Sequence, residues 1–277
     1  AAQAGAQVLT RTNGTIAEMR NQGAARARGS ILVFIDADVH ITPKWAENIA
    51  QRIQELVVNP RTLTGSLCGI PANASLIERS WFDPNLRNQR ITHIGSGHLI
   101  TTREFFAELG GFAEDLRTGE DYDLSRRAVA AGGMIVHADE LYVEHLGFPT
   151  SVRQFIIREM WHGESDFVAL GAVTRSKVAL LTVAFTAFHI AIFVAIAARN
   201  FLWAVTFAAF IILLCVTSSA IKYAGKPTSI VATNSLLFYC YFIGRTGALF
   251  KGILGRVSPR ISGLSARNPR RTAPSRH

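Results

Sequence analysis

The sequence has no acidic residue beyond Asp166. All 20 Asp and Glu residues lie within residues 1–166, which also hold 16 of the 29 Lys and Arg residues. The net charge is therefore −4 in residues 1–166 and +13 in residues 167–277. Because the positive charge flanks apolar segments and accompanies no groove-reading motif, it argues against a nucleic-acid partner and favours membrane lipids with anionic headgroups.

Cysteine is scarce as well. The three cysteines, Cys68, Cys215 and Cys240, are widely separated and match neither a disulfide framework nor a zinc-ligand pattern. We therefore expect reduced thiols and a first domain that faces the cytoplasm. The first residues also lack the charged segment and short apolar run of a secretory signal peptide, so none is expected.

Long apolar runs without charge are present in the second half of the chain. Val178–Ala198 and Phe201–Ile221 are each 21 residues long, and a helix of about 20 residues crosses a bilayer core. They predict a membrane-spanning hairpin with both flanks on the cytoplasmic side, because basic residues stand at both flanks. A buried helical pair in a soluble core is the alternative. The flanking basic residues are Arg175, Lys177, Lys222 and Lys226.

The end of the chain combines a shorter apolar segment, residues 229–244, within an expected anchor helix at 229–251, with a basic tail, residues 258–277. If the segment spanned the membrane, the tail would be translocated against the charge rule, so an interfacial helix is favoured over a spanning one. The tail is rich in Pro, Ser, Gly and Arg, which predicts disorder. We expect a first domain at 1–166, membrane-anchor helices at 167–257, and the tail.

Strand and helix patterns alternate in the first domain. Residues 6–10 predict a short strand, and residues 15–28 predict a helix that ends at Gly29. Residues 31–35 form a continuous apolar run, typical of a parallel strand buried on both faces. Residues 42–58 open with a capping threonine and a first-turn proline, and they predict a second helix. This order predicts a doubly wound α/β sheet.

Two carboxylates, Asp36 and Asp38, directly follow the apolar run. Open α/β sheets bind their ligands at the carboxyl ends of strands. One carboxylate can ligate a divalent cation while the other holds a ribose or sugar hydroxyl. Mg²⁺ or Mn²⁺ bound by such oxygen ligands would neutralise a leaving diphosphate. A solvated turn is the equal alternative, because Asp is common in turns.

A second acidic pair, Glu120 and Asp121, stands at the start of a predicted helix whose apolar face carries Leu124, Ala128 and Ala131. Interaction with the helix dipole alone explains acids at this position. A carboxylate that points into a cleft can also deprotonate an acceptor hydroxyl. The two interpretations are compatible.

Three further places are candidates for ligand binding. His145 follows a predicted strand, residues 141–144, and could complete a metal site, although a single histidine is more often structural. Gly97 precedes an apolar pair in a loop where the backbone must approach something closely, and a tight turn is the equal alternative. The other residues considered for substrate binding are His98, Arg158 and Trp161.

The order of these segments is more specific than any one of them. It runs through RNQG at 20–23, ILVFIDAD at 31–38, GSGHLITTREFFAELGGF at 95–112 and GEDYDLSRRA at 119–128, then a basic segment and membrane helices. Over residues 6–165 this order resembles the family 2 glycosyltransferases. The resemblance implies a Rossmann-like GT-A domain followed by C-terminal transmembrane or interfacial helices. It also implies inverting transfer from a nucleotide sugar to a lipid-linked or glycan acceptor of the cell envelope, at the cytoplasmic membrane.

The resemblance also implies roles for individual residues. Asp36 and Asp38 match the family's Asp-x-Asp motif, with Asp38 as the metal ligand. Asp121 matches the second acid of the Glu-Asp motif, which implies that it is the general base. The residues implied to contact the nucleotide or to shape the donor and acceptor pocket are Arg20, Gly97, His98 and Glu120.

Two departures from the family pattern matter. Gln154, Arg158 and Trp161 are spaced differently from the Gln-x-x-Arg-Trp motif of processive members, which favours addition of a single sugar. The family's first strand, with its Pro-x-Tyr-Asn-like nucleotide site, and its second strand, which ends in acids, are not found before residue 6, so we expect an N-terminally incomplete domain.

Two other functions stay open at this point. A metal-dependent nucleotidyl- or phosphotransferase also uses paired acids, and it would release pyrophosphate where a glycosyltransferase releases a nucleoside diphosphate. An inactive membrane-bound remnant that acts as a scaffold is the non-enzymatic alternative, and the missing first strands motivate it.

Overall fold

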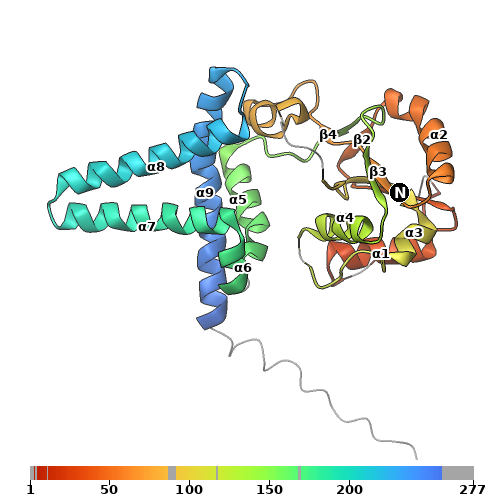
Figure 1. The fold of residues 1–277 in the computed structure, drawn as a ribbon, viewed down its shortest axis with the longest axis horizontal. Coiled ribbons are helices and arrows are strands. Elements are labelled where there is room, and N and C mark those ends of the chain that lie inside the picture. The colour runs from red at the N-terminus through yellow and green to blue at the C-terminus, as the bar shows by residue number, and fades with distance from the viewer. Residues whose placement is uncertain are drawn as a thin grey trace, which may run out of the picture. The chain divides into compact units, whose positions relative to one another are not determined.

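The chain forms two compact units in a computed structural model (Figure 1). The first unit comprises residues 1–155 and 213–239, and the second comprises residues 156–212 and 240–277. The expected boundary at residue 166 stays a prediction: in this division residues 156–166 group with the second unit, and residues 213–239 group with the first. The tail at 258–277 lies outside the described residues. The structure describes residues 3, 5–10, 12–86, 92–116, 118–167 and 170–257.

Four described strands of the first unit form one mixed sheet. Its order is β1 (Ile31–Ile35), β5 (His98–Thr102), β3 (Thr62–Gly65) and β6 (Met134–His137). Strands β1 and β3 run antiparallel to β5, whereas β6 runs parallel to β3. The predicted α/β class is confirmed, and the sheet contains both strand directions.

The prediction that Ile31–Ile35 is a parallel strand buried on both faces is wrong. Strand β1 pairs antiparallel with β5, its one neighbour among the described strands. A strand with one neighbour leaves a backbone edge and adjoining side chains open, and Val33 is 40% exposed. Strand β5 lies inside the sheet and is buried at all five positions.

Helices cover both faces of this sheet. Alternate residues of a strand point to opposite faces, so Leu99 and Ile100 of β5 belong to different core clusters. Leu99 packs with residues of α1, α3 and α4, whereas Ile100 packs with Leu56 of α2 (Figure 1). The helices are α1 (Ile16–Arg26), α2 (Pro43–Val58), α3 (Arg103–Glu108) and α4 (Glu120–Ala130).

The helix starts follow local capping chemistry. Helix α2 covers the predicted range: the Thr42 hydroxyl accepts from the N–H of Trp45, and a proline occupies the first turn. Helix α1 begins after Thr15, which forms a capping box with Glu18. It ends at Arg26, three residues before the expected glycine cap, because Ala27 adopts an extended conformation.

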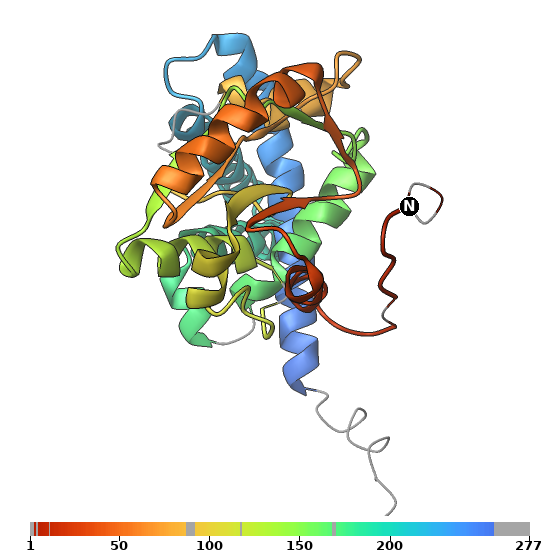
Figure 2. The ribbon, with the colours of Figure 1, turned by 90° about the vertical axis from the view of Figure 1, so that its right-hand side faces the viewer.

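The strand predicted at residues 6–10 is absent. These described residues have no regular structure and are exposed, and Figure 2 shows the segment running outside the sheets. A strand requires backbone hydrogen bonds to a neighbour, and no described strand pairs with this segment.

A second, smaller sheet of the first unit is formed by three described strands. Its order is β2 (Val39–Ile41), β7 (Val143–His145) and β4 (Cys68–Gly69). Strand β7 pairs antiparallel with β2 and parallel with β4. The strand expected at 141–144 is present one to two residues later in the chain.

The C-terminal part is helical. In the described part of the chain, α7 (Lys177–Ala197) and α8 (Phe201–Lys222) are long and apolar enough to cross a membrane, by length and composition alone. Each lies within one residue of its predicted range. The segment expected at 229–251 lies within one longer helix, α9 (Thr228–Val257). The remaining elements are η2 (Glu78–Phe82), η3 (Pro84–Leu86), α5 (Val152–His162), η4 (Glu164–Phe167) and α6 (Leu170–Arg175).

Candidate active site

The register of β1 and β5 places Asp36 opposite residues 95–97, the glycine loop that precedes β5. Ile35 pairs with His98, so the next residue, Asp36, faces Gly97, and its backbone N–H donates to the Gly97 carbonyl at 3.1 Å. A Cβ atom at Gly97 would lie 3.1 Å from Oδ2 of Asp36. Glycine therefore lets this loop approach the carboxylate closely.

Arg20 joins Asp36 to the second acidic segment. Its Nη2 donates to Oδ1 of Asp36 at 2.5 Å, and its Nη1 donates to Oε1 of Glu120 at 2.7 Å. The side chains of Arg20 and Glu120 are 14% and 10% exposed, so their ion pair is largely shielded from water, whereas the Asp36 side chain is 37% exposed. The forked guanidinium can hold two carboxylates at once, and hydrogen bonds between charged groups are stronger than neutral ones.

Ser96 connects the glycine loop to both acids at the start of α4. Its hydroxyl donates to Oε1 of Glu120 at 3.0 Å, and its backbone N–H donates to Oδ2 of Asp121 at 3.2 Å. Oδ1 of Asp121 accepts from the N–H of Tyr122 at 2.7 Å. Glu120 is buried, whereas Asp121 keeps partial exposure. The structure thus brings Asp36 and Asp121 to the two ends of one hydrogen-bond network.

The register of the second sheet brings Asp38 to His145. Val39 pairs with His145, and the N–H of Leu146 extends the ladder by donating to the Asp38 carbonyl at 2.8 Å. Nε2 of His145 lies 3.8 Å from Oδ2 of Asp38. A Cβ atom at Gly147 would lie 1.9 Å from the same Oδ2, so the carboxylate occupies space that a side chain would fill.

Asp38 and His145 fit an open divalent-cation site. Their 3.8 Å separation is within the roughly 4.2 Å that two ligands, each about 2.1 Å from one ion, can span. Among the described residues, no three His, Cys, Asp or Glu side chains form a metal cluster. A pair of protein ligands suits Mg²⁺ or Mn²⁺ when substrate phosphates and water supply the other ligands. Asp38 is exposed, so such ligands can reach it.

His98 has a different environment from the one expected for a sugar-binding residue. Its ring is fully buried, Nε2 accepts from Nε1 of Trp45 at 2.8 Å, and Nδ1 lies 2.9 Å from the Ser66 hydroxyl. Burial lowers the pKa of His98 from 6.5 to about 4, so the imidazole is neutral at pH 7. Of the pair Gly97 and His98, the glycine faces Asp36.

Part of this chain is similar in sequence to known proteins. Residues 2–102 match the family described as glycosyl transferase family 2. This match lies within the first unit, which is therefore similar to family 2 glycosyltransferases over these residues.

Three curated relatives have names that agree with this family. A pre-mycofactocin glycosyltransferase of Mycobacterium tuberculosis is 26% identical over 161 residues, which is 54% of this chain and 33% of that protein. An uncharacterized glycosyltransferase of Haemophilus influenzae is 29% identical over 127 residues, 42% of this chain and 41% of that protein. A putative polypeptide N-acetylgalactosaminyltransferase 10 of Drosophila melanogaster is 24% identical over 141 residues, 42% of this chain and 22% of that protein. The chain therefore spans less than half the length of these relatives.

Two predicted binding residues lie outside the first unit. Arg158 and Trp161 are on α5 in the second unit. Nη1 of Arg158 donates to Oε1 of Glu159 at 3.0 Å, and the Trp161 ring contacts the His162 ring. The other predicted site residues all belong to the first unit.

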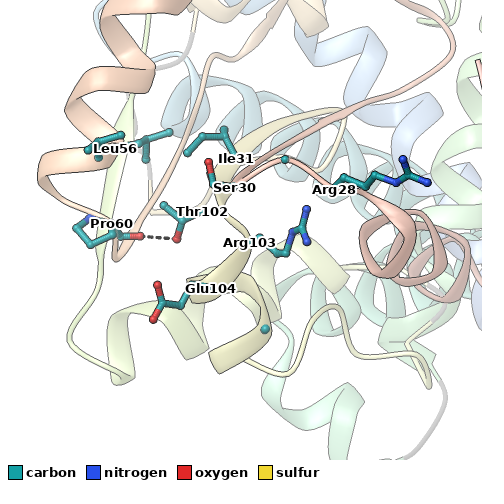
Figure 3. A pocket seen from close by; sticks show the side chains of 11 residues that line it. Arg28, Ser30, Ile31, Leu56, Pro60, Thr102, Arg103 and Glu104 are labelled. Carbon is teal, nitrogen blue, oxygen red and sulfur yellow. Dashed lines mark hydrogen bonds between the residues drawn. The ribbon is translucent and has the colours of Figure 1, made fainter.

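A pocket of about 470 Å³ lies at the opposite end of β1 from Asp36 (Figure 3). Ser30 lines it, and Asp36 is six positions further along extended chain, about 20 Å at 3.3 Å per residue. The Thr102 hydroxyl donates to the Pro60 carbonyl at 2.8 Å across this pocket's wall (Figure 3). None of the predicted site residues lines it.

Sequence reasoning missed Ser96 and Gly147. Ser96 lies inside the GSGH segment, but a serine in a loop carries no signal of its own. Gly147 follows His145 by two residues, and its importance depends on the pairing of β2 with β7, which the sequence pattern does not reveal. Both residues matter through their type, the hydroxyl of Ser96 and the missing side chain of Gly147, but it is the fold that brings them beside the acids.

Proposed function

We propose that this domain transfers a sugar from a nucleotide-diphosphate sugar to a hydroxyl acceptor, with inversion at the anomeric carbon. The observation that carries the proposal is the network from Asp36 through Arg20, Glu120 and Ser96 to Asp121. It supports one site in which a donor-binding carboxylate and a base are held by the same set of hydrogen bonds.

Asp121 is the general base of the proposed reaction. As the acceptor oxygen attacks the anomeric carbon, Asp121 takes the hydroxyl proton and a new carbon–oxygen bond forms. The bond from the anomeric carbon to the diphosphate oxygen breaks, and the nucleoside diphosphate leaves from the opposite face. The N–H groups of Ser96 and Tyr122 support this role, because they orient the carboxylate of a partly exposed residue.

The donor occupies the other end of the network. Asp38 and His145 would hold a divalent ion, Mg²⁺ or Mn²⁺, which would neutralise charge on the leaving diphosphate. Asp36 accepts from a ribose or sugar hydroxyl. Arg20 fixes the orientation of the Asp36 carboxylate beside Gly97, so that one carboxylate oxygen stays available to the donor.

The decisive experiment is a donor screen on the full chain in detergent, scored by release of nucleoside diphosphate with and without Mn²⁺. Asp121→Asn should lower turnover by about 10³-fold or more while leaving donor binding nearly unchanged. Asp123→Asn is the matched control, because Asp123 is on the same helical turn but pairs with Arg126 and Arg127. Wild-type turnover in Asp121→Asn would remove the base, and release of pyrophosphate would indicate nucleotidyl transfer.

The acceptor is proposed to be a lipid-linked or cell-envelope glycan at the cytoplasmic membrane. The proposal is supported by large apolar side chains that α7 and α8 leave exposed, such as Phe193, Leu202 and Ile212. Extensive exposed apolar surface is typical of membrane or protein contact. With both flanks in the cytoplasm, the turn at Arg199 lies on the far side.

Cysteine labelling tests this topology. In a variant without native cysteines, Arg199→Cys should react with an impermeant maleimide in intact cells, whereas Lys226→Cys should react only after the membrane is opened. Labelling of both positions from one side would contradict a spanning hairpin. Labelling in the reversed order would contradict the cytoplasmic orientation.

A further inference from the structure

We infer that Phe148 and Phe82 are positioning residues for His145. The three side chains form a stack of rings that sets the orientation of the imidazole beside Asp38. This inference rests on the proposed role of Asp38 and His145 in holding a divalent ion.

The rings are close and nearly parallel. The centroids of His145 and Phe148 are 4.2 Å apart with an interplanar angle of 14°. The centroids of Phe148 and Phe82 are 4.5 Å apart with an angle of 12°. A planar neighbour restricts rotation of the imidazole about its bond to Cβ, because turning the ring would drive its edge into the face of Phe148.

The far end of the stack rests on a fixed part of the first unit. Phe82 is 3% exposed and ends the π-helical turn η2, where it also contacts Phe155. The preceding residue, Trp81, packs edge-on against Phe155, and the ammonium of Lys222, the last residue of α8, lies 3.5 Å from its ring centroid. The stack is therefore built on a segment that two other elements hold in place.

Ring orientation matters at the His145 end. A metal ligand must present one nitrogen at about 2.1 Å from the ion, and here Nε2 is the nitrogen near Asp38. The N–H of Gly147 donates to Nδ1 at 3.1 Å, which aligns the ring from its other edge. Groups that orient a metal-ligating histidine typically change metal affinity by 10- to 100-fold when they are removed.

The test is a titration of the full chain in detergent with Mn²⁺ alone, followed by the electron paramagnetic resonance signal of the free ion. Phe148→Leu keeps an apolar side chain but removes the planar face, and it should weaken Mn²⁺ binding by about 10-fold. Phe148→Tyr keeps the ring and should stay within about twofold of the wild type. Phe148→Met serves as the non-planar variant if the leucine variant does not fold.

Matched variants separate this inference from the proposed function. Phe106→Leu makes the same change in a buried aromatic cluster on the α3 side and should leave Mn²⁺ affinity unchanged. If His145→Ala and Asp38→Ala bind Mn²⁺ like the wild type, the metal site itself is wrong. If those two weaken binding while folded Phe148→Leu or Phe148→Met does not, only the positioning role is overturned. If Phe148→Tyr weakened Mn²⁺ binding as much as Phe148→Leu does, the positioning role would be overturned as well.

Discussion

The guanidinium of Arg20 lies 2.5 Å from the carboxylate of Asp36, although Arg20 is on α1 and Asp36 follows β1. The same group lies 2.7 Å from Glu120, which is 100 residues further along the chain than Arg20. One cation therefore connects the two acidic segments that the proposed reaction needs on opposite sides of the sugar. Without Arg20, the buried carboxylate of Glu120 and the partly exposed carboxylate of Asp36 would lose the positive charge that both contact.

Replacement of Arg20 should lower turnover while leaving the domain folded. Arg20→Met removes both charge-assisted hydrogen bonds, and we expect turnover to fall by about 10²-fold, equivalent to about 3 kcal/mol. Arg26→Met is the control, since Arg26 is exposed in the last turn of the same helix. Initial rates at saturating donor, with circular dichroism as the fold check, measure the effect. Equal rates for the two variants would show that the bridge has no part in turnover.

Local signals in the sequence were enough to predict the elements that carry the acids. The capping hydroxyl of Thr42 and the proline after it start α2, and the apolar run before Asp36 is a strand. Glu120 and Asp121 occupy the first turn of α4. Each of these features depends on residues within one or two helical turns, so a pattern of neighbours is sufficient to predict it.

Pairing between distant strands could not be predicted in the same way. His98 follows a glycine loop and resembled a ligand-binding residue, yet the pairing of β5 with β1 and β3 buries its ring. The antiparallel partner of β1 is 63 residues away at the pair Ile35 and His98, and no local pattern encodes that register. The contact between Asp38 and Gly147 depends on such a register too.

A methyl group at position 147 should damage the proposed metal site specifically. In Gly147→Ala the new Cβ would lie 1.9 Å from Oδ2 of Asp38, so the carboxylate must move away. We expect Mn²⁺ affinity to fall by about 10-fold or more, measured by titration of the purified chain. Gly23→Ala adds the same atom in open space within α1, and it should leave affinity unchanged while stabilising the helix by up to about 1 kcal/mol. Unaltered Mn²⁺ binding in Gly147→Ala would argue against Asp38 as a ligand.

The buried imidazole of His98 should make the domain sensitive to acid. Its folded pKa, about 4, is below the ordinary value of 6.5, so the unfolded chain takes up the proton first as pH falls. The contribution of neutral His98 to the free energy of unfolding is fully present above pH 6.5. It falls by about 1.4 kcal/mol per pH unit down to about pH 4.

Removal of the titrating group tests this dependence. His98→Gln keeps polar atoms near Trp45 and Ser66, and it should flatten the pH dependence of the unfolding free energy by about one proton between pH 6 and 4.5. His162→Gln is a parallel variant, because burial lowers the pKa of His162 in the second unit to about 3. Urea unfolding at several pH values measures both slopes. A slope in His98→Gln equal to the wild type would mean that His98 is not the group that titrates.

A buried ion-pair network holds the second unit together. Arg245 of α9 donates to Oε2 of Glu159 and to Oδ2 of Asp166, each at 3.0 Å. The Glu159 side chain is 4% exposed, so its charge depends on protein partners for stabilisation. Arg245→Met removes the partner that joins both acids, and we expect a loss of about 3–5 kcal/mol in the free energy of unfolding.

The loss is expected to arise from the buried carboxylate of Glu159, and a second replacement that removes this carboxylate tests that cause. Arg245→Met combined with Glu159→Met also removes the buried carboxylate, which has lost Arg245 and keeps Arg158 as a partner, and it should recover most of the lost stability because a buried ion pair replaced by apolar groups is often neutral. Lys251→Met breaks a more exposed pair with Glu164 and should cost less than about 1 kcal/mol. Thermal unfolding of all four proteins in the same detergent compares them. If Arg245→Met were no less stable than Lys251→Met, the network would contribute no more than a surface pair, and packing between α5 and α9 would have to hold this unit.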